Sequence, residues 1–126
     1  MEVINNAPNA PSPVGPYSQA TVVGELVFTA GQIGIDSKTS KLVQGIEAQT
    51  VQVLNNLNAV LEAAGSSLEQ AALVTIFLSD LNYAPQVNEI YAQYVSRENP
   101  PARQTVAVKA LPLNALVEIS IIAERI

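Results

Sequence analysis

Few side chains near the end of the sequence carry charge, and their types suggest a chemistry. Between Pro101 and Ala123 the ionisable residues are Arg103, Lys109 and Glu118. A guanidinium can bind a carboxylate through two parallel hydrogen bonds, which the ammonium of a lysine cannot match. A carboxylate such as that of Glu118 can orient a water molecule or carry a proton. Arg103 and Glu118 could therefore bind a small carboxylate-bearing substrate and act on it.

The strands predicted around these two residues determine whether their side chains can meet. Alternation along residues 103–110 places Arg103 and Thr105 on one face, and alternation along residues 116–124 assigns a face to Glu118. If the two strands form a hairpin, Arg103 lies directly across from Glu118, although a slip of one residue would separate them. The pair could then form a cross-strand salt bridge worth about 0.2–1 kcal/mol at a surface. Alternatively, the guanidinium of Arg103 stays free to bind a substrate.

Three other residues are candidates that also have simple structural explanations. Tyr17 follows a proline-rich segment and could be a core aromatic residue or line a pocket with its hydroxyl. Gly31 could mark a bend at the end of a strand, or could bring its backbone close to a ligand. Asn88 lies on a predicted helix, where such a residue is most often solvated. None of the three identifies a site by itself.

Two absences from the composition narrow the possible chemistry. The chain has no cysteine and no histidine. Disulfides, thiolate nucleophiles and zinc sites with cysteine ligands are therefore excluded, and the commonest general base and metal ligand of proteins is missing. We expect no metal site, and we expect any reaction to use carboxylates, hydroxyls, lysine, arginine, backbone groups or water.

Charge and hydropathy constrain the partners and the location of the protein. The formal net charge is −5 and the six cations are scattered singly, whereas nucleic-acid binding requires a clustered basic face. No apolar run approaches the roughly 20 residues that a membrane span needs. The N-terminus has neither the basic nor the apolar region of a signal peptide. We therefore expect a cytoplasmic protein that binds neither nucleic acid nor membrane.

The balance of apolar and charged residues suggests that the chain associates with itself. Hydrophobic residues make up 48% of the sequence and charged residues 13%, well below the roughly 25% charged residues of typical soluble domains. With 126 residues the chain is long enough for a core of its own, and we expect a single domain over residues 1–126. Contact with another subunit would account for part of the apolar excess.

Apolar periodicity predicts seven elements in the order β-β-α-β-α-β-β. Helices are predicted at residues 46–64 and 83–96, because apolar residues recur there at spacings of three and four. In the first helix the stripe consists of Val51, Leu54, Leu57, Leu61 and Ala64. Strands are predicted at residues 17–23, 26–30, 72–79, 103–110 and 116–124. The fold class is therefore α+β, with two helices on one face of a mixed sheet and an oligomer partner covering the other face.

Several motifs, in order along nearly the whole chain, resemble those of one protein family. They are GPYSQA at residues 15–20, TAGQIG at 29–34, AGSSLEQ at 64–70, FLSDLNYAPQVNEIY at 77–91, PPARQTV at 100–106 and VEISIIA at 117–123. Together they resemble the RidA/YjgF family of reactive-intermediate (enamine/imine) deaminases. The PARxxV pattern followed by a VEI strand is the most specific part of the resemblance.

The resemblance implies a fold, an assembly and a reaction. The implied fold is the chorismate-mutase-like α+β fold, assembled as a homotrimer with sites between subunits. The implied activity is that of a 2-iminobutanoate/2-iminopropanoate deaminase, which hydrolyses 2-imino and enamine acids such as 2-aminoacrylate and 2-iminobutyrate to 2-keto acids and ammonia. Neither a metal nor an organic cofactor is implied. A non-catalytic trimer that binds 2-keto acids as a sensor stays open as the alternative, because both functions need Arg103.

The resemblance also assigns roles to individual residues. It implies that Arg103 binds the substrate carboxylate and that Glu118 orients the water or acts as acid and base. It implies that Tyr17 lines the cleft and that the backbone of Gly31 meets the imine or keto end of the substrate. Asn88 corresponds to the asparagine of the second helix.

Two positions depart from the commonest pattern of the family. Thr105 stands two residues after the arginine, where a cysteine is often found, and Ala30 stands where a serine often precedes the glycine. Thr105 keeps a hydroxyl that can donate to a substrate, and the reaction needs no covalent intermediate. We therefore expect activity to survive, while the sequence does not determine how these departures affect substrate preference.

Overall fold

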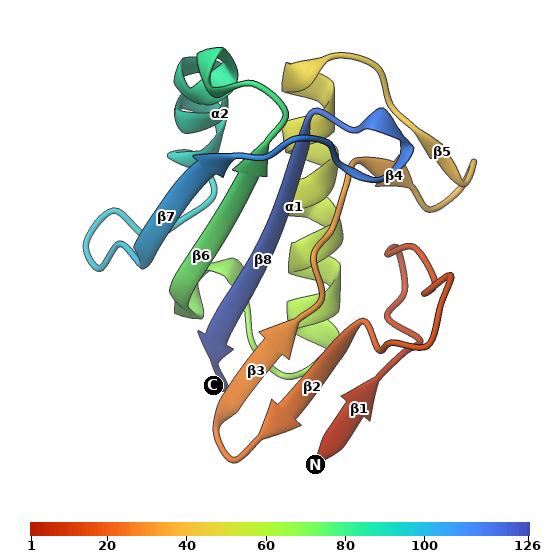
Figure 1. The fold of residues 1–126 in the computed structure, drawn as a ribbon. Helices are drawn as coiled ribbons and strands as arrows, with labels where there is room; N and C mark the ends of the chain where they lie inside the picture. The colour runs from red at the N-terminus through yellow and green to blue at the C-terminus, as the bar shows by residue number, and fades with distance from the viewer.

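The computed structural model describes residues 1–126, which form a six-stranded sheet with two helices on one face (Figure 1). The helices are α1 (Ile46–Ala63) and α2 (Ala84–Tyr91). In their order across the sheet, the strands are β1 (Glu2–Ile4), β2 (Ala20–Val23), β3 (Leu26–Thr29), β8 (Val117–Glu124), β6 (Ala71–Leu78) and β7 (Ala102–Ala107). A separate two-stranded sheet pairs β4 (Ile35–Asp36) with β5 (Lys41–Leu42). The predicted α+β class with two helices on one face is confirmed.

Helix α1 packs on the sheet through an apolar stripe. Its fully buried apolar residues are Val53, Leu54, Leu57, Val60 and Leu61. They recur at spacings of three and four, and burial of each such side chain contributes about 1.5–3 kcal/mol. Val51, which the predicted stripe included, lies on the exposed side instead. The helix ends near Gly65, whose φ of 81° favours glycine.

Strand β8 lies in the middle of the sheet and has two different faces. The residues buried against the helices are Val117, Ile119, Ile121 and Ala123. Glu118, Ser120 and Ile122 alternate with them and point to the opposite face, where they are half-buried. The strand pairs with β3 on one side and with β6 on the other, antiparallel in both cases. The alternation predicted from the sequence is thus present, and it places Glu118 on the face without helices.

The predicted hairpin between residues 103–110 and 116–124 is wrong. Strand β7 pairs in parallel with β6, and β8 is inserted between β3 and β6 (Figure 1). Helix α2 provides the crossover that two parallel neighbours require. A strand as apolar as β8 buries more surface in the centre of the sheet, whereas β7, most of whose residues are exposed, lies at the edge.

Several element boundaries also differ from the prediction. The strand expected at residues 17–23 begins at Ala20, and the second helix ends at Tyr91 rather than at Ser96. The hairpin of β2 and β3 is confirmed, with Gly24 at a φ of 60° in its turn. The short strands β1, β4 and β5 were not expected, because two or three residues carry too little periodicity. Neither helix has the length and apolar character that crossing a membrane would require.

Candidate functional site

Arg103 lies on the edge strand β7 and points to the side of the sheet that the helices cover. It pairs in parallel register with Val74, which is fully buried beneath the helices, and paired residues of adjacent strands point the same way. Its Nη1 donates a hydrogen bond to Oδ1 of Asn88 at 2.7 Å. Its guanidinium carbon lies 5.0 Å from the centre of the Tyr91 ring. Helix α2 therefore supplies both contacts that hold the exposed guanidinium.

Four residues around this guanidinium form what we call the arginine cluster: Arg103, Thr105, Asn88 and Tyr91. Thr105 is two residues along the same face of β7, and its hydroxyl is buried without a hydrogen-bond partner. The hydroxyl of Tyr91 is also buried and unpartnered. Burial raises the pKa of Tyr91, and the positive charge of Arg103 offsets part of this rise. The cluster contains no carboxylate, so its positive charge is available to an anion.

Glu118 and Gly31 are in close contact on the other side of the sheet. A Cβ atom on Gly31 would lie 2.7 Å from Oε2 of Glu118 and 2.9 Å from its Cδ, closer than real Cβ atoms approach. Only a glycine therefore leaves the carboxylate where it is. Burial raises the pKa of Glu118 above that of a solvated glutamate. A raised pKa is the direction in which acid-base catalysis by a carboxyl group is favoured.

A cavity of about 710 Å³ opens beside this carboxylate and is lined by Glu118, Gly31 and Tyr17. We call it the glutamate cavity. Its other walls come from the proline-rich segment 11–14, from residues 30–35 and from Pro112 and Leu113. Glu118 is the one carboxylate among the lining residues, and most of the remaining surface is apolar. The predicted residues Tyr17, Gly31 and Glu118 are thus brought together here.

A buried glutamine that the sequence analysis did not single out holds the proline-rich wall of the glutamate cavity. The side chain of Gln19, only 2% exposed, accepts a hydrogen bond from the amide of Ala7 at 2.9 Å. It also donates to the carbonyl of Pro11 at 2.8 Å. A proline-rich segment has few amides for regular pairing, so a side-chain amide has to fix its course.

Two more buried amides on helix α1 hold segments beside the glutamate cavity. Gln49 accepts a hydrogen bond from the amide of Leu116 at 2.8 Å, two residues before Glu118. Asn56 donates to the carbonyl of Ile35 at 2.9 Å. The sequence could have revealed both residues, because each lies three or four residues from a buried valine and therefore on the buried side of the helix. Buried polar groups that keep their hydrogen bonds in this way rigidify the segments they contact.

The arginine cluster and the glutamate cavity lie on opposite faces of the sheet within one chain. Arg103 pairs with Val74, whereas Glu118 pairs with Phe77. Val74 and Phe77 are three residues apart on β6 and therefore point to opposite faces. The expectation that Arg103 lies across from Glu118 is wrong, and the two side chains form no salt bridge. Instead, Arg103 lies with Asn88 and Thr105, while Glu118 lies with Tyr17 and Gly31.

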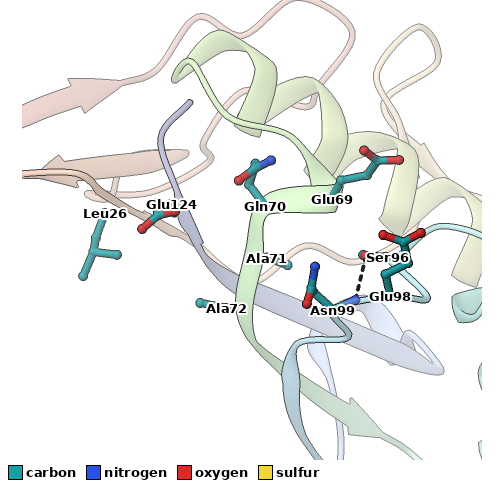
Figure 2. Close-up of a pocket in the computed structure, with 9 residues that line it drawn as sticks. All are labelled: Leu26, Glu69, Gln70, Ala71, Ala72, Ser96, Glu98, Asn99 and Glu124. Carbon is teal, nitrogen blue, oxygen red and sulfur yellow. Dashed lines mark hydrogen bonds between the residues drawn. The ribbon is translucent and has the colours of Figure 1, made fainter.

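A second hollow, of about 480 Å³, contains none of the predicted site residues (Figure 2). Its lining includes three carboxylates, those of Glu69, Glu98 and Glu124, and no cation. An anionic substrate would be repelled there. The carboxylates do not form a group that could hold a metal ion. This hollow therefore lacks the groups that the predicted chemistry needs.

Comparisons with known proteins find relatives that match nearly the whole chain. The family model described as Endoribonuclease L-PSP matches residues 7–125. The RutC family protein PH0854 of Pyrococcus horikoshii is 52% identical over 116 residues, which are 91% of this chain and 91% of that protein. The chloroplastic Reactive Intermediate Deaminase A of Arabidopsis thaliana is 46% identical over 115 residues, 90% of this chain and 61% of that protein.

The fold is also shared with a solved relative. The structure of E. coli TdcF with bound serine superposes with a TM-score of 0.92 at 33% identity, and the match covers 100% of both chains. The range that the family model matches contains the positions of the arginine cluster and of the glutamate cavity. The chain therefore belongs to the RidA/YjgF family of reactive-intermediate deaminases.

Proposed function

We propose that this protein hydrolyses reactive 2-imino and enamine acids, such as 2-aminoacrylate and 2-iminobutyrate, to 2-keto acids and ammonia. The observation that carries the proposal is the guanidinium of Arg103, which Asn88 and Tyr91 hold but no carboxylate neutralises. A guanidinium has five N–H donors, and Asn88 uses one of them. The remaining donors can bind a substrate carboxylate through two parallel hydrogen bonds.

The proposed reaction needs a fixed substrate and a positioned water. Arg103 binds the carboxylate, and Glu118 holds a water beside the imine carbon C2. The water attacks C2, one of its protons passes to the nitrogen through Glu118, and the resulting carbinolamine releases ammonia as C=O replaces C=N. Such acid-base catalysis raises a reaction rate by about 10²–10⁴-fold. Because the substrate also hydrolyses spontaneously, the only other contribution required is its orientation beside the water.

Arg103 and Glu118 can act on one substrate only if they come from different copies of the chain. We propose that the site forms between subunits of a homotrimer, with the arginine cluster of one copy facing the glutamate cavity of the next. The exposed edge strand β7 and the half-buried face of the sheet, where Phe77 and Ile122 lie, support association. Light scattering should then give three times the 13.3 kDa of one chain, and a monomer would contradict the proposal.

A coupled assay tests the reaction. A dehydratase generates 2-iminobutyrate, and release of 2-ketobutyrate is followed with and without the protein. We expect the wild type to accelerate the release of 2-ketobutyrate. In Arg103→Ala we expect kcat/KM to fall by about 10²–10⁴-fold, because two charge-assisted hydrogen bonds of about 1.5–3 kcal/mol each are lost. Near-normal rates for Arg103→Ala would contradict the role of Arg103 in binding the carboxylate.

Binding of 2-keto acids without turnover is the second candidate function. The relative TdcF was solved with bound serine, a small amino acid with a carboxylate, and this observation is compatible with a sensor. The same coupled assay separates the two functions. A protein that binds 2-ketobutyrate in calorimetry but leaves the rate of imine hydrolysis unchanged would be a sensor.

The name of the family model also raises ribonuclease activity. The net charge of −5 argues against an RNA-binding surface, and one of the six cations, Arg125, is paired with Glu2 at 2.8 Å. We propose that nucleic acid is not a substrate. RNA cleavage by the purified protein that disappears in Arg103→Ala would contradict this.

A further inference from the structure

The arginine on which the proposed function depends is exposed on an edge strand, where a long side chain has many rotamers to choose from. Binding a carboxylate through two parallel hydrogen bonds requires the plane of the guanidinium to be fixed before the substrate arrives. The hydrogen bond of Arg103 to Asn88 involves a single nitrogen, Nη1. One such bond fixes the position of that nitrogen but leaves the plane free to rotate about it.

The ring of Tyr91 supplies the constraint that is missing. It is 7% exposed and packed in the core, so it cannot move out of the way. The guanidinium carbon of Arg103 lies 5.0 Å from the ring centre, within the range of a cation–π contact. Asn88 and Tyr91 are three residues apart on α2 and therefore lie on one side of the helix. Asn88 binds one edge of the guanidinium through a hydrogen bond, and the ring of Tyr91 contacts the guanidinium as well.

The contribution of Tyr91 comes from its ring and not from its hydroxyl. A buried tyrosine hydroxyl usually finds a hydrogen-bond partner, and that of Tyr91 has none. The hydroxyl therefore makes no hydrogen bond that could hold Arg103. An aromatic ring attracts a cation through its face, and Arg103 is the cation at the ring of Tyr91.

We propose that Tyr91 is a positioning residue that fixes the orientation of Arg103, so that the donors not used by Asn88 face the substrate carboxylate. This inference rests on the proposed role of Arg103. Loss of the ring face should weaken binding of the carboxylate. It should leave the chemistry at Glu118 unchanged, because Tyr91 contacts Arg103 and is not among the residues that line the glutamate cavity.

Three variants test this inference. Tyr91→Leu removes the ring, Tyr91→Phe keeps it, and Tyr94→Leu makes the same change on a residue that faces another hollow, beside Asn55 and Asn58. Calorimetry with 2-ketobutyrate gives the affinity, and the coupled assay gives kcat at saturation. We expect Tyr91→Leu to weaken binding about 3- to 30-fold, the range of a cation–π contact, with kcat retained. We expect Tyr91→Phe to bind like the wild type, and Tyr94→Leu to lose thermal stability without losing affinity.

Two results would overturn the inference. One is unchanged affinity in Tyr91→Leu, and the other is a loss in Tyr91→Phe as large as in Tyr91→Leu, since the hydroxyl would then be what matters. A second readout does not depend on turnover. The NMR signal of the Arg103 Nε–H should carry a ring-current shift in the wild type and in Tyr91→Phe that is absent in Tyr91→Leu. If the wild type hydrolyses no imine but these shifts and affinities behave as stated, the proposed reaction fails while the role of Tyr91 stands.

Discussion

At the scale of single residues, the contact between Gly31 and Glu118 means that any side chain at position 31 would displace the carboxylate of Glu118. We expect Gly31→Ala to fold, because the atoms that its Cβ would meet belong to the flexible end of Glu118. The displaced carboxylate should then lower kcat by about 10²-fold, as misplacements of about 1 Å do. Steady-state kinetics of imine hydrolysis measure the effect.

Gly34→Ala is the matched control for this substitution. Its Cβ would lie 2.9 Å from the backbone Cα of Gln49 on helix α1, so it should destabilise the fold without touching Glu118. Full kcat in Gly31→Ala would show that the position of the Glu118 carboxylate is unimportant.

The raised pKa of Glu118 makes a prediction about stability and pH. Burial disfavours the charged form, so the native state holds its proton to higher pH than the unfolded chain does. Between the ordinary pKa of glutamate and the raised one, the stability of the wild type should therefore fall as pH rises. Glu118→Gln cannot titrate there, and its melting temperature relative to the wild type should rise through this window. A difference that stays constant with pH would contradict the shift.

The residue scale also shows what the sequence could and could not predict about the site. The motifs identified Arg103 and Asn88, and the structure joins them by a hydrogen bond. Tyr91 lies within the helix predicted at residues 83–96, but a sequence does not show which cation an aromatic ring will contact. The roles of these residues in binding and catalysis stay predictions.

At the scale of elements, helix α1 both packs the core and fixes the walls of the glutamate cavity. Asn56 is fully buried and donates to the carbonyl of Ile35. We expect Asn56→Ala to lower the free energy of unfolding by about 1–3 kcal/mol, because that carbonyl is left without a partner. Asn55→Ala changes an exposed neighbour on the same helix and should stay within about 0.5 kcal/mol of the wild type. Urea titration measures both, and equal effects would contradict the structural role of Asn56.

Elements whose burial follows from their own sequence were predictable, and strand partners were not. The stripe of α1 and the alternation of β8 follow directly from the apolar pattern. The pairing of β7 depends on how much surface every other strand buries, which no local pattern contains. The short segment between residues 103–110 and 116–124 favoured a hairpin, but β7 and β8 are separated by β6.

At the scale of the whole molecule, the sheet separates the two residues that the proposed reaction needs. The register of β6 with its two neighbours directs Arg103 and Glu118 to opposite faces. In the proposed homotrimer, each site takes Arg103 from one copy and Glu118 from the adjacent copy. The contact between copies would also cover the half-buried surface of the sheet. This arrangement stays a prediction, and it can be tested by mixing defective copies.

Arg103→Ala and Glu118→Gln carrying different affinity tags can be co-expressed and purified over both tags, so that every assembly contains both variants. Each mixed trimer then has one site that takes Arg103 from the Glu118→Gln copy and Glu118 from the Arg103→Ala copy. We expect such mixed trimers to recover about one third of the wild-type rate of 2-iminobutyrate hydrolysis, while each variant alone stays near background. Mixed assemblies as inactive as their parents would contradict a site shared between Arg103 and Glu118 of two copies.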